Sequence, residues 1–501
     1  MSTQSAPPAR PERIPVNMVK WGLGCVGLGM VICTGLAMLA LIIAPIVFRN
    51  LPGEWQDRFV RNIPITARLL PTHPPIVLPT SGASKNDVIA LLASPTPTQP
   101  SVATPTQGSS SLSSGGDGLD NSSSSTPIPP TNTPQADSSN ITPTPVINFT
   151  SEPSQQEATQ IPTIAPTSTL EPVPVNFHNS SFKLVPQHWN DCGPANLTQA
   201  LVYYGWAGTQ EDAASYLKPN PADKNVSPWQ MVDFVNKKTG VKALWRVSGD
   251  LNLVKRLVAN KFAVIMETGY DVAGEGWMGH YLTVIGYDDN QNILYGMDTY
   301  LLDGKDHQGY REQYDDIDRR WQAFNRTYIV VYTEDRIGEL AAILGPDADL
   351  NYNYEHARSV ARYDASLQPN NAFAWFNLGS SLVLLHRYKE AVVAFDQAQN
   401  VNGLPDRFLW YQFTPYEAYY NTGNYANVLA LVQSALNSTL DVEETYYWKA
   451  MAEAAMGQTA SAEADFQRVL RFNPNFTLAA DRLTELQTQK FAPPAVAQAG
   501  Q

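Results

Sequence analysis

The sequence predicts an α+β domain followed by an all-α domain of helical repeats, preceded by a single membrane span and an unfolded linker. Three observations predict this fold class. An uncharged apolar stretch lies near the N-terminus, mixed helical and alternating patterns fill residues 177–335, and purely helical patterns repeat after residue 336. The 501 residues also exceed the roughly 250–300 at which a single core stops growing, so several domains are expected.

The composition narrows the class of protein. The net charge is -13, and 16% of the residues are charged against about 25% in an average soluble protein. This acidic excess argues against a nucleic-acid partner. Three cysteines are too few for a disulfide-built fold or a Cys-rich metal module. The expected parts are a short N-terminal tail (1–20), a transmembrane helix (21–48), a juxtamembrane segment with a Ser/Thr/Pro-rich disordered linker (49–175), the α+β domain (176–335), the repeat domain (336–490) and a disordered tail (491–501).

Residues 21–48 are predicted to cross a membrane. They contain no charged residue, and about 20 apolar residues suffice to span a bilayer. A signal peptide would have an apolar region of only about 7–15 residues. Basic residues flank both ends of the stretch, so the positive-inside rule leaves its orientation open.

Residues 71–175 are predicted to form an unfolded stalk. They hold 19 of the 38 prolines, and Phe149 is their only aromatic residue. Such a segment cannot bury enough apolar surface to offset the entropy of the chain. Because tracts of this kind are typical of stalks that hold a domain away from a surface, we expect the C-terminal domains to lie outside the cytoplasm.

The stretch QHWNDCGPANLTQALVYYGW places a cysteine at the start of a helix. Leu197, Leu201 and Tyr204 recur at helical spacing, and Pro194 suits a first helical turn. Unpaired N–H groups and the helix dipole favour an anion at this end of a helix. Cys192 is therefore expected where a nucleophilic thiolate is stabilised.

His280 is the histidine best placed to act as a base. It begins the alternating stretch GHYLTVIGYDD, which predicts a strand with His280, Leu282 and Val284 on one face. The turn DDNQN follows, and NILYGMDTY is predicted to return as the next strand.

The pairing of these two strands predicts a partner for His280. If Tyr287 faces Ile293 across the turn, then Leu282 faces Asp298, because opposed residues share a face of the sheet. Asp298 would then lie diagonal to His280 and fix its tautomer. A register slip of one residue would send Asp298 to the other face.

Gln187 completes the expected site. Attack on a carbonyl develops an oxyanion that needs preorganised hydrogen-bond donors. The side-chain amide of Gln187 and the backbone N–H of Cys192 would supply two of them.

At this point the sequence resembles a known family. The block QHWNDCGPANLTQAL, followed about 90 residues later by GHYLTVIGYDD and then MDTY, is similar to the bacteriocin-processing type of papain-like cysteine peptidases, in particular to stand-alone members. The resemblance covers roughly residues 177–335. It implies that Cys192 is the nucleophile, His280 the base, Asp298 its orienting carboxylate and Gln187 the oxyanion residue. The family usually has Asp-Pro where this chain has Asp-Thr, and the chain has no GxxxxGK[ST] motif of a transporter ATPase.

Other interpretations of nearby positions stay open. Asp288 competes with Asp298 as the carboxylate that orients the histidine. His188 and Asp191 lie beside the predicted site in the sequence, but we expect both in a solvated loop. The glycine-rich stretch DVAGEGWMG is expected to form a mobile loop over the site.

After residue 336, four windows align at a spacing of roughly 34–37 residues and resemble tetratricopeptide repeats. Small residues at fixed positions would let paired helices approach, and aromatic residues would fill the gaps. A stack of such pairs offers a groove for an extended peptide or a partner protein. Tyr416, Tyr419 and Tyr420 are expected to pack in the core, with a groove-lining position as the alternative. The clearest window carries Trp375, Leu378, Gly379, Tyr388, Ala391, Phe395 and Ala398.

Together these predictions indicate a membrane-anchored cysteine peptidase. Its thiolate would attack a peptide carbonyl, and His280 would protonate the leaving amine and then activate water. The expected partners are a peptide or protein substrate and a protein bound by the repeats; no metal or organic cofactor is expected. Two alternatives stay open, namely acyl transfer by the same residues and a non-catalytic interaction scaffold.

Overall fold

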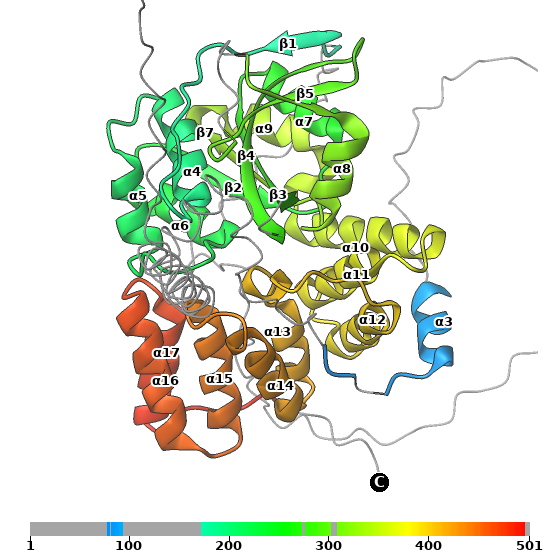
Figure 1. The fold of residues 1–501 in the computed structure, drawn as a ribbon, viewed down its shortest axis with the longest axis vertical. Helices are drawn as coiled ribbons and strands as arrows, with labels where there is room; N and C mark the ends of the chain where they lie inside the picture. Colours follow the sequence, from blue (N-terminus) through cyan, green and yellow to red (C-terminus); the bar gives the residue numbers. More distant parts are fainter. Residues whose placement is uncertain (1–77, 81, 94–171, 273–275, 302–307, 496–501) are drawn as a thin grey trace, which may run out of the picture.

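The computed structural model describes residues 78–80, 82–93, 172–272, 276–301 and 308–495. Within them, an α+β domain lies above a helical domain in the view of Figure 1. The predicted membrane span at residues 21–48 lies outside the described residues. In the part of the chain that the structure describes, none of the helices combines the length and the hydropathy that a membrane crossing requires.

The α+β domain is built on one antiparallel sheet. Within the described residues its strand order is β2-β7-β3-β4-β5-β6, and β1 pairs with β4 beside this path. The long hairpin of β3 and β4 forms the centre of the sheet. The strands are β1 (Asn176–His178), β2 (Lys242–Arg246), β3 (Ala263–Val272), β4 (Gly276–Asp288), β5 (Ile293–Met297), β6 (Tyr310–Gln313) and β7 (Tyr328–Tyr332).

The alternation of side chains along the strands divides the core into two layers. Tyr281 and Ile285 of β4 pack on one side of the sheet with the first three helices of the domain, whereas Leu282 and Val284 pack on the other side with the next three. This confirms the predicted faces of these four residues, although the strand begins at Gly276 rather than at His280 as expected. The helices are α4 (Cys192–Tyr203), α5 (Gln210–Leu217) and α6 (Pro228–Lys238) on the first side, and α7 (Leu251–Ala259), α8 (Tyr314–Gln322) and α9 (Ile337–Leu344) on the second.

Helix α9 carries the α+β domain past residue 335, where we expected it to end. Leu340, Ile343 and Leu344 are buried in the same core as Val254 of α7. Two short 3-10 turns, η2 (Glu334–Arg336) and η3 (Gly345–Ala348), flank α9. The helical domain therefore begins at α10.

The helical domain consists of helices that pack as antiparallel neighbours along the chain. A methyl group on Gly379 of α11 would lie 2.6 Å from a ring carbon of Phe395 in α12, so a small residue is what lets this pair approach. Tyr416, Tyr419 and Tyr420 are buried, which confirms their packing position and makes the groove-lining alternative wrong. The elements are α10 (Leu350–Leu367), α11 (Ala372–Leu384), α12 (Tyr388–Val401), η4 (Phe408–Trp410), α13 (Thr414–Asn421), α14 (Tyr425–Leu436), α15 (Glu443–Ala455), α16 (Thr459–Phe472) and α17 (Thr477–Gln487).

Helix α3 (Lys85–Ala93) lies within the segment that we expected to be unfolded, and it packs beside α12 (Figure 1). Leu91 and the preceding Leu78 are buried in the core of the helical domain. The backbone N–H of Leu78 donates to Oε1 of Gln399 at 2.5 Å. For residues 78–80 and 82–93 the expectation of an unfolded linker is therefore wrong. Their apolar side chains Leu78 and Leu91 are buried against the helical domain.

The two domains share a continuous apolar core. Trp277 of β4 stacks on Phe324 with ring centroids 5.8 Å apart. On the repeat side its ring meets Phe408 and Tyr411 at 5.6 and 5.9 Å. The β3–β4 hairpin thus continues through much of the glycine-rich stretch that we expected to be a mobile loop. That expectation is wrong for its described residues, since residues 271 and 272 pair with residues 277 and 276.

Candidate active site

Cys192 is the first residue of α4, as the sequence predicted. Its thiol is half-buried and free. The residues that follow it on the helix are buried against the sheet, and Gly193 allows this close approach. A methyl group on Gly193 would lie 3.2 Å from Val226 and 3.6 Å from the ring of Tyr281. The cysteine is therefore fixed at the end of a packed helix, where the dipole favours negative charge.

His280 lies on β4 opposite Thr268 of β3. Its Nε2 is 3.2 Å from Oδ1 of Asp298, and the two side chains are only 6% and 0% exposed. Burial opposes protonation of the ring, but the Asp298 carboxylate and the Cys192 side chain outweigh it and raise the pKa of His280 to about 10. An imidazolium is therefore expected here at neutral pH.

Asp298 follows β5 directly, and backbone N–H groups of the next residues fix its carboxylate. Its Oδ1 accepts the N–H groups of Tyr300 at 2.8 Å and Leu301 at 2.7 Å. Burial alone would raise the pKa of Asp298, but the charge of His280 and these hydrogen bonds lower it. The carboxylate is therefore both ionised and fixed in orientation.

The strand register that joins these residues differs in detail from the prediction. Near the turn, Tyr287 faces Leu294 rather than Ile293, which is a shift of one residue. A β-bulge between Val284 and Gly286 reverses that shift. On the far side of the bulge, Thr283 pairs with Met297, which is the predicted register. This register extends toward His280 and Asp298, which were predicted to be diagonal neighbours.

Gln187 is tied to the residue after Asp298. Its backbone N–H donates to the carbonyl of Thr299 at 3.0 Å. In return, the Thr299 hydroxyl donates to Oε1 of Gln187 at 2.8 Å. Because Oε1 is occupied as an acceptor, the amide Nε2 is left as the group that can donate to an oxyanion.

A buried polar network supports this arrangement, and the sequence reasoning missed it. The two N–H groups of the Asn196 amide are shared among three acceptors, namely the carbonyls of Cys192 and Tyr281, at 2.9 and 2.8 Å from Nδ2, and the Thr299 hydroxyl at 3.2 Å. The amide oxygen accepts the Thr283 hydroxyl at 2.7 Å. One amide thus joins the cysteine helix, the histidine strand and the segment after Asp298. The sequence signal of this network was Thr299, which follows Asp298 where the family usually has a proline.

The competing residues are not brought into this group. Asp288 lies at the far end of β4, where it accepts Gln291 Nε2 at 2.5 Å. His188 is exposed and faces Glu211 at 3.5 Å. Asp191 is buried, so the expectation of a solvated loop is wrong for this residue. Its carboxylate pairs with Nζ of Lys218 at 2.9 Å. Within the described ranges, His, Cys, Asp and Glu side chains nowhere gather in threes that could hold a metal ion.

Comparisons with known proteins agree with the two-domain organisation. Residues 179–329 match the model of the Peptidase_C39 like family, and residues 443–476 match that of the tetratricopeptide repeat. A solved structure described as a candidate C39-like peptidase from Bacillus anthracis is 15% identical. That match covers 32% of this chain and 98% of the other, with a TM-score of 0.26. No curated protein matches this chain.

Proposed function

For a chain that carries a C39-like peptidase domain followed by tetratricopeptide repeats, we propose the activity of a membrane-anchored cysteine peptidase that cleaves peptide bonds through Cys192, His280 and Asp298. The observation that carries this proposal is the buried pair of His280 and Asp298 beside a cysteine at a helix N-terminus. A pseudoenzyme would have no need to keep an ionised carboxylate buried against that histidine.

Each side chain has a defined step in this mechanism. The Cys192 thiolate attacks the peptide carbonyl, and the oxyanion accepts hydrogen bonds from Gln187 Nε2 and the Cys192 backbone N–H. Protonated His280 then donates its proton to the leaving amine. Neutral His280 next takes a proton from water, which attacks the acyl-enzyme and releases the second product. Asp298 stabilises the imidazolium form throughout.

The test is the reactivity of Cys192 in the full-length protein. We expect iodoacetamide to alkylate it at least about tenfold faster than in the His280→Ala variant, because the imidazolium stabilises the thiolate. The Cys192→Ser variant serves as the blank, and mass spectrometry of a digested peptide library reports cleavage. Equal alkylation rates with and without His280, and no cleavage, would favour a non-catalytic scaffold instead.

The proposal includes the membrane and the repeats. Residues 21–48 would anchor the chain, with the C-terminal domains outside the cytoplasm, and the repeats would position a protein substrate or partner. Protease added to intact cells is then expected to degrade the peptidase domain. A domain that stays protected until the cells are lysed would contradict this orientation.

A further inference from the structure

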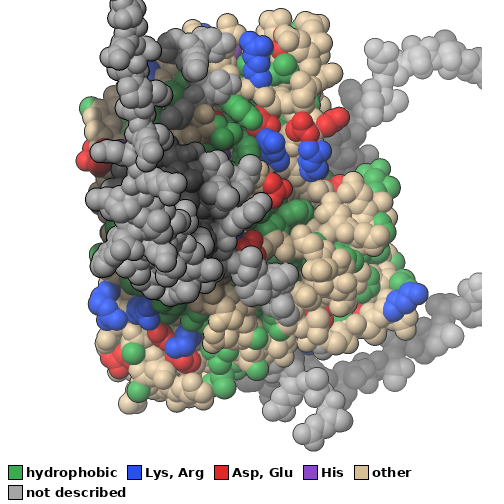
Figure 2. Space-filling view, viewed as in Figure 1, with side chains coloured by type: hydrophobic (Ala, Val, Ile, Leu, Met, Phe, Trp, Pro, Cys, Tyr) green, Lys and Arg blue, Asp and Glu red, His purple; other side chains and the backbone are tan. Residues whose placement is uncertain are grey.

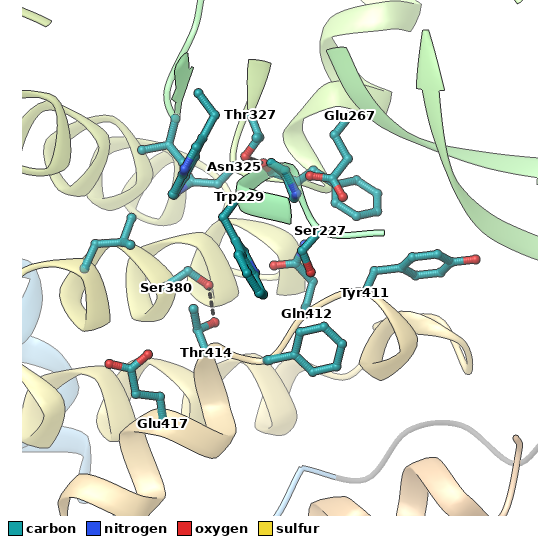
Figure 3. A pocket seen from close by; sticks show the side chains of 16 residues that line it. Ser227, Trp229, Glu267, Asn325, Thr327, Ser380, Tyr411, Gln412, Thr414 and Glu417 are labelled. Atoms are coloured by element: carbon teal, nitrogen blue, oxygen red, sulfur yellow. Dashed lines mark hydrogen bonds between the residues drawn. The ribbon is translucent and has the colours of Figure 1, made fainter. Parts of the chain in front are cut away.

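A cavity lies at the junction of the peptidase domain and the repeats (Figure 3). Its volume is about 120 Å³. That is well below the roughly 300–1,000 Å³ of sites for whole small molecules, but close to the ~150 Å³ that holds a benzene ring. The cavity therefore has room for one side chain. Half-buried Trp229 and Gln412 belong to its wall, so solvent reaches it.

The wall of this cavity is aromatic and acidic. Trp229, Trp245 and Tyr411 supply aromatic surface, and Glu267 and Glu417 supply carboxyl groups. No lysine, arginine or histidine is among the described residues that line it. Figure 3 shows Glu267 and Glu417 on different sides of the indole of Trp229. The aromatic faces favour an elongated cation through cation–π contact, and such a cation would in turn favour the ionised form of the two carboxyl groups.

Glu267 is the acidic group next to the proposed active site. It is 4% exposed, and its Oε1 lies 3.3 Å from the Tyr281 hydroxyl, which it shares with the nearer carbonyl of Val226. Among the described residues no cation pairs with it. Burial, with a smaller contribution from the charge of Cys192, outweighs the Tyr281 hydrogen bond and raises the pKa of Glu267 well above its usual range. The carboxyl group is therefore neutral while the cavity is empty, and a bound cation would supply the opposite charge that favours its ionised form.

Short contacts connect the cavity to both catalytic segments. Tyr281 follows His280, and its hydroxyl donates to the carbonyl of Val226, next to the cavity wall, at 2.8 Å. The ring of the same tyrosine packs against Gly193, the neighbour of the nucleophile. From the repeats, Tyr411 approaches Gly279 so closely that a methyl group there would lie 3.0 Å from its ring. One tyrosine thus links the cavity wall to the neighbour of Cys192, and Cys192 is close enough to act electrostatically on Glu267.

We propose that this cavity is a substrate subsite for a lysine or arginine side chain, with Glu267 as its specificity-determining residue and the repeat residue Tyr411 as part of its wall. The inference rests on the proposed peptidase activity and names a preference of that same site. It also assigns the repeats a direct part in the substrate site, because the peptidase domain alone would lack one side of the subsite.

Cleavage-site profiling of the full-length protein tests this preference. A peptide library digested by the enzyme is sequenced by mass spectrometry, and residue frequencies are aligned on the cleaved bond. We expect lysine and arginine to be enriched about tenfold at one position near that bond. Glu267→Gln should reduce the enrichment to about twofold or less. Glu444→Gln, another buried acid of the domain boundary that does not line the cavity, should keep it.

A binding experiment separates failure of the subsite from failure of the peptidase proposal. The full-length Cys192→Ala variant is immobilised, incubated with the same library and eluted. Basic peptides are expected to be enriched, and Glu267→Gln in that background should abolish the enrichment. Binding preference without cleavage would refute the peptidase activity alone. Cleavage without any basic preference would overturn the subsite, as would a Glu267→Gln profile equal to that of wild type.

Discussion

Thr299 gives the sharpest test of how the oxyanion donor is held. We consider the Thr299→Val substitution, which keeps the shape of a side chain that is 1% exposed and removes only its hydroxyl. The hydroxyl donates to Gln187 Oε1 at 2.8 Å and accepts from Asn196 at 3.2 Å. Asn196 keeps two backbone acceptors at 2.8 and 2.9 Å, so the main loss is the restraint on the Gln187 amide.

The magnitude follows from comparing two losses. Removing an oxyanion donor outright, as in Gln187→Ala, is expected to lower kcat by about 100- to 1,000-fold. Thr299→Val leaves the donor present but unrestrained, and one neutral hydrogen bond contributes about 1 kcal/mol. We therefore expect a fall of roughly fivefold to tenfold in kcat/KM. In a Gln187→Ala background the same substitution should have little further effect, because the two residues act as a unit.

Two rates measured on one protein decide the point. Hydrolysis of a library-derived peptide needs the oxyanion donor, whereas alkylation of Cys192 by iodoacetamide does not. Thr299→Val should slow the first and leave the second unchanged. Thr283→Val is the matched control, since its buried hydroxyl donates to Asn196 and makes no contact with Gln187. The reasoning would be refuted if the Thr299→Val variant hydrolysed the peptide at the wild-type rate, or if its hydrolysis and alkylation rates fell equally.

Three further predictions concern other parts of the molecule. Asp298→Asn removes the carboxylate that raises the pKa of His280 to about 10, so the alkaline limb of the kcat/KM profile should move at least about one pH unit lower. An alkaline limb at the wild-type pH would show that Asp298 does not set the pKa of His280. Burial and the Asp223 carboxylate raise the pKa of Glu444 to about 8, so the folded state binds more protons than the unfolded state and stability falls as the pH rises from about 5 to 8. Glu444→Gln should flatten this fall in thermal unfolding, and an equally steep fall would count against the reasoning. Gly379→Ala places a methyl group 2.6 Å from an aromatic ring and should cost about 1–3 kcal/mol in urea unfolding, whereas Gly338→Ala, with open space around it, should cost nothing; equal stabilities would contradict the close helix packing.

The placement of the candidate site followed from local patterns in the sequence. A helix start and a strand's alternation are set by neighbouring residues, so the positions of Cys192 and His280 were predictable. The register of the β4–β5 hairpin was less predictable. Gly286 marks the bulge, and a methyl group there would lie 2.5 Å from the Phe177 carbonyl oxygen of β1. A strand more than 100 residues away thus sets a detail that the hairpin sequence alone leaves open.

The features that the sequence did not reveal depend on contacts between distant segments. Asn196 reads as an ordinary polar residue of a helix, and its importance appears only when Tyr281 and Thr299 are brought to it. The cavity beside Glu267 needs walls from both domains. No periodicity within either domain predicts how the two faces meet, because that depends on the shape of the packed surfaces.

Helix α3 changes what the proline-rich segment can do. Residues 93 and 172 both belong to the described body, so the two ends of the segment between them are attached to the same body. Residues 49–77 alone would then set the reach from the predicted membrane span, at most about 100 Å when fully extended. A protease that cut within residues 94–171 would sever the chain without releasing the enzyme, since burial of Leu78 and Leu91 contributes roughly 1.5–3 kcal/mol each to holding the pieces together. With the chain anchored as proposed, release of the peptidase domain by such a cut would require α3 to undock as well.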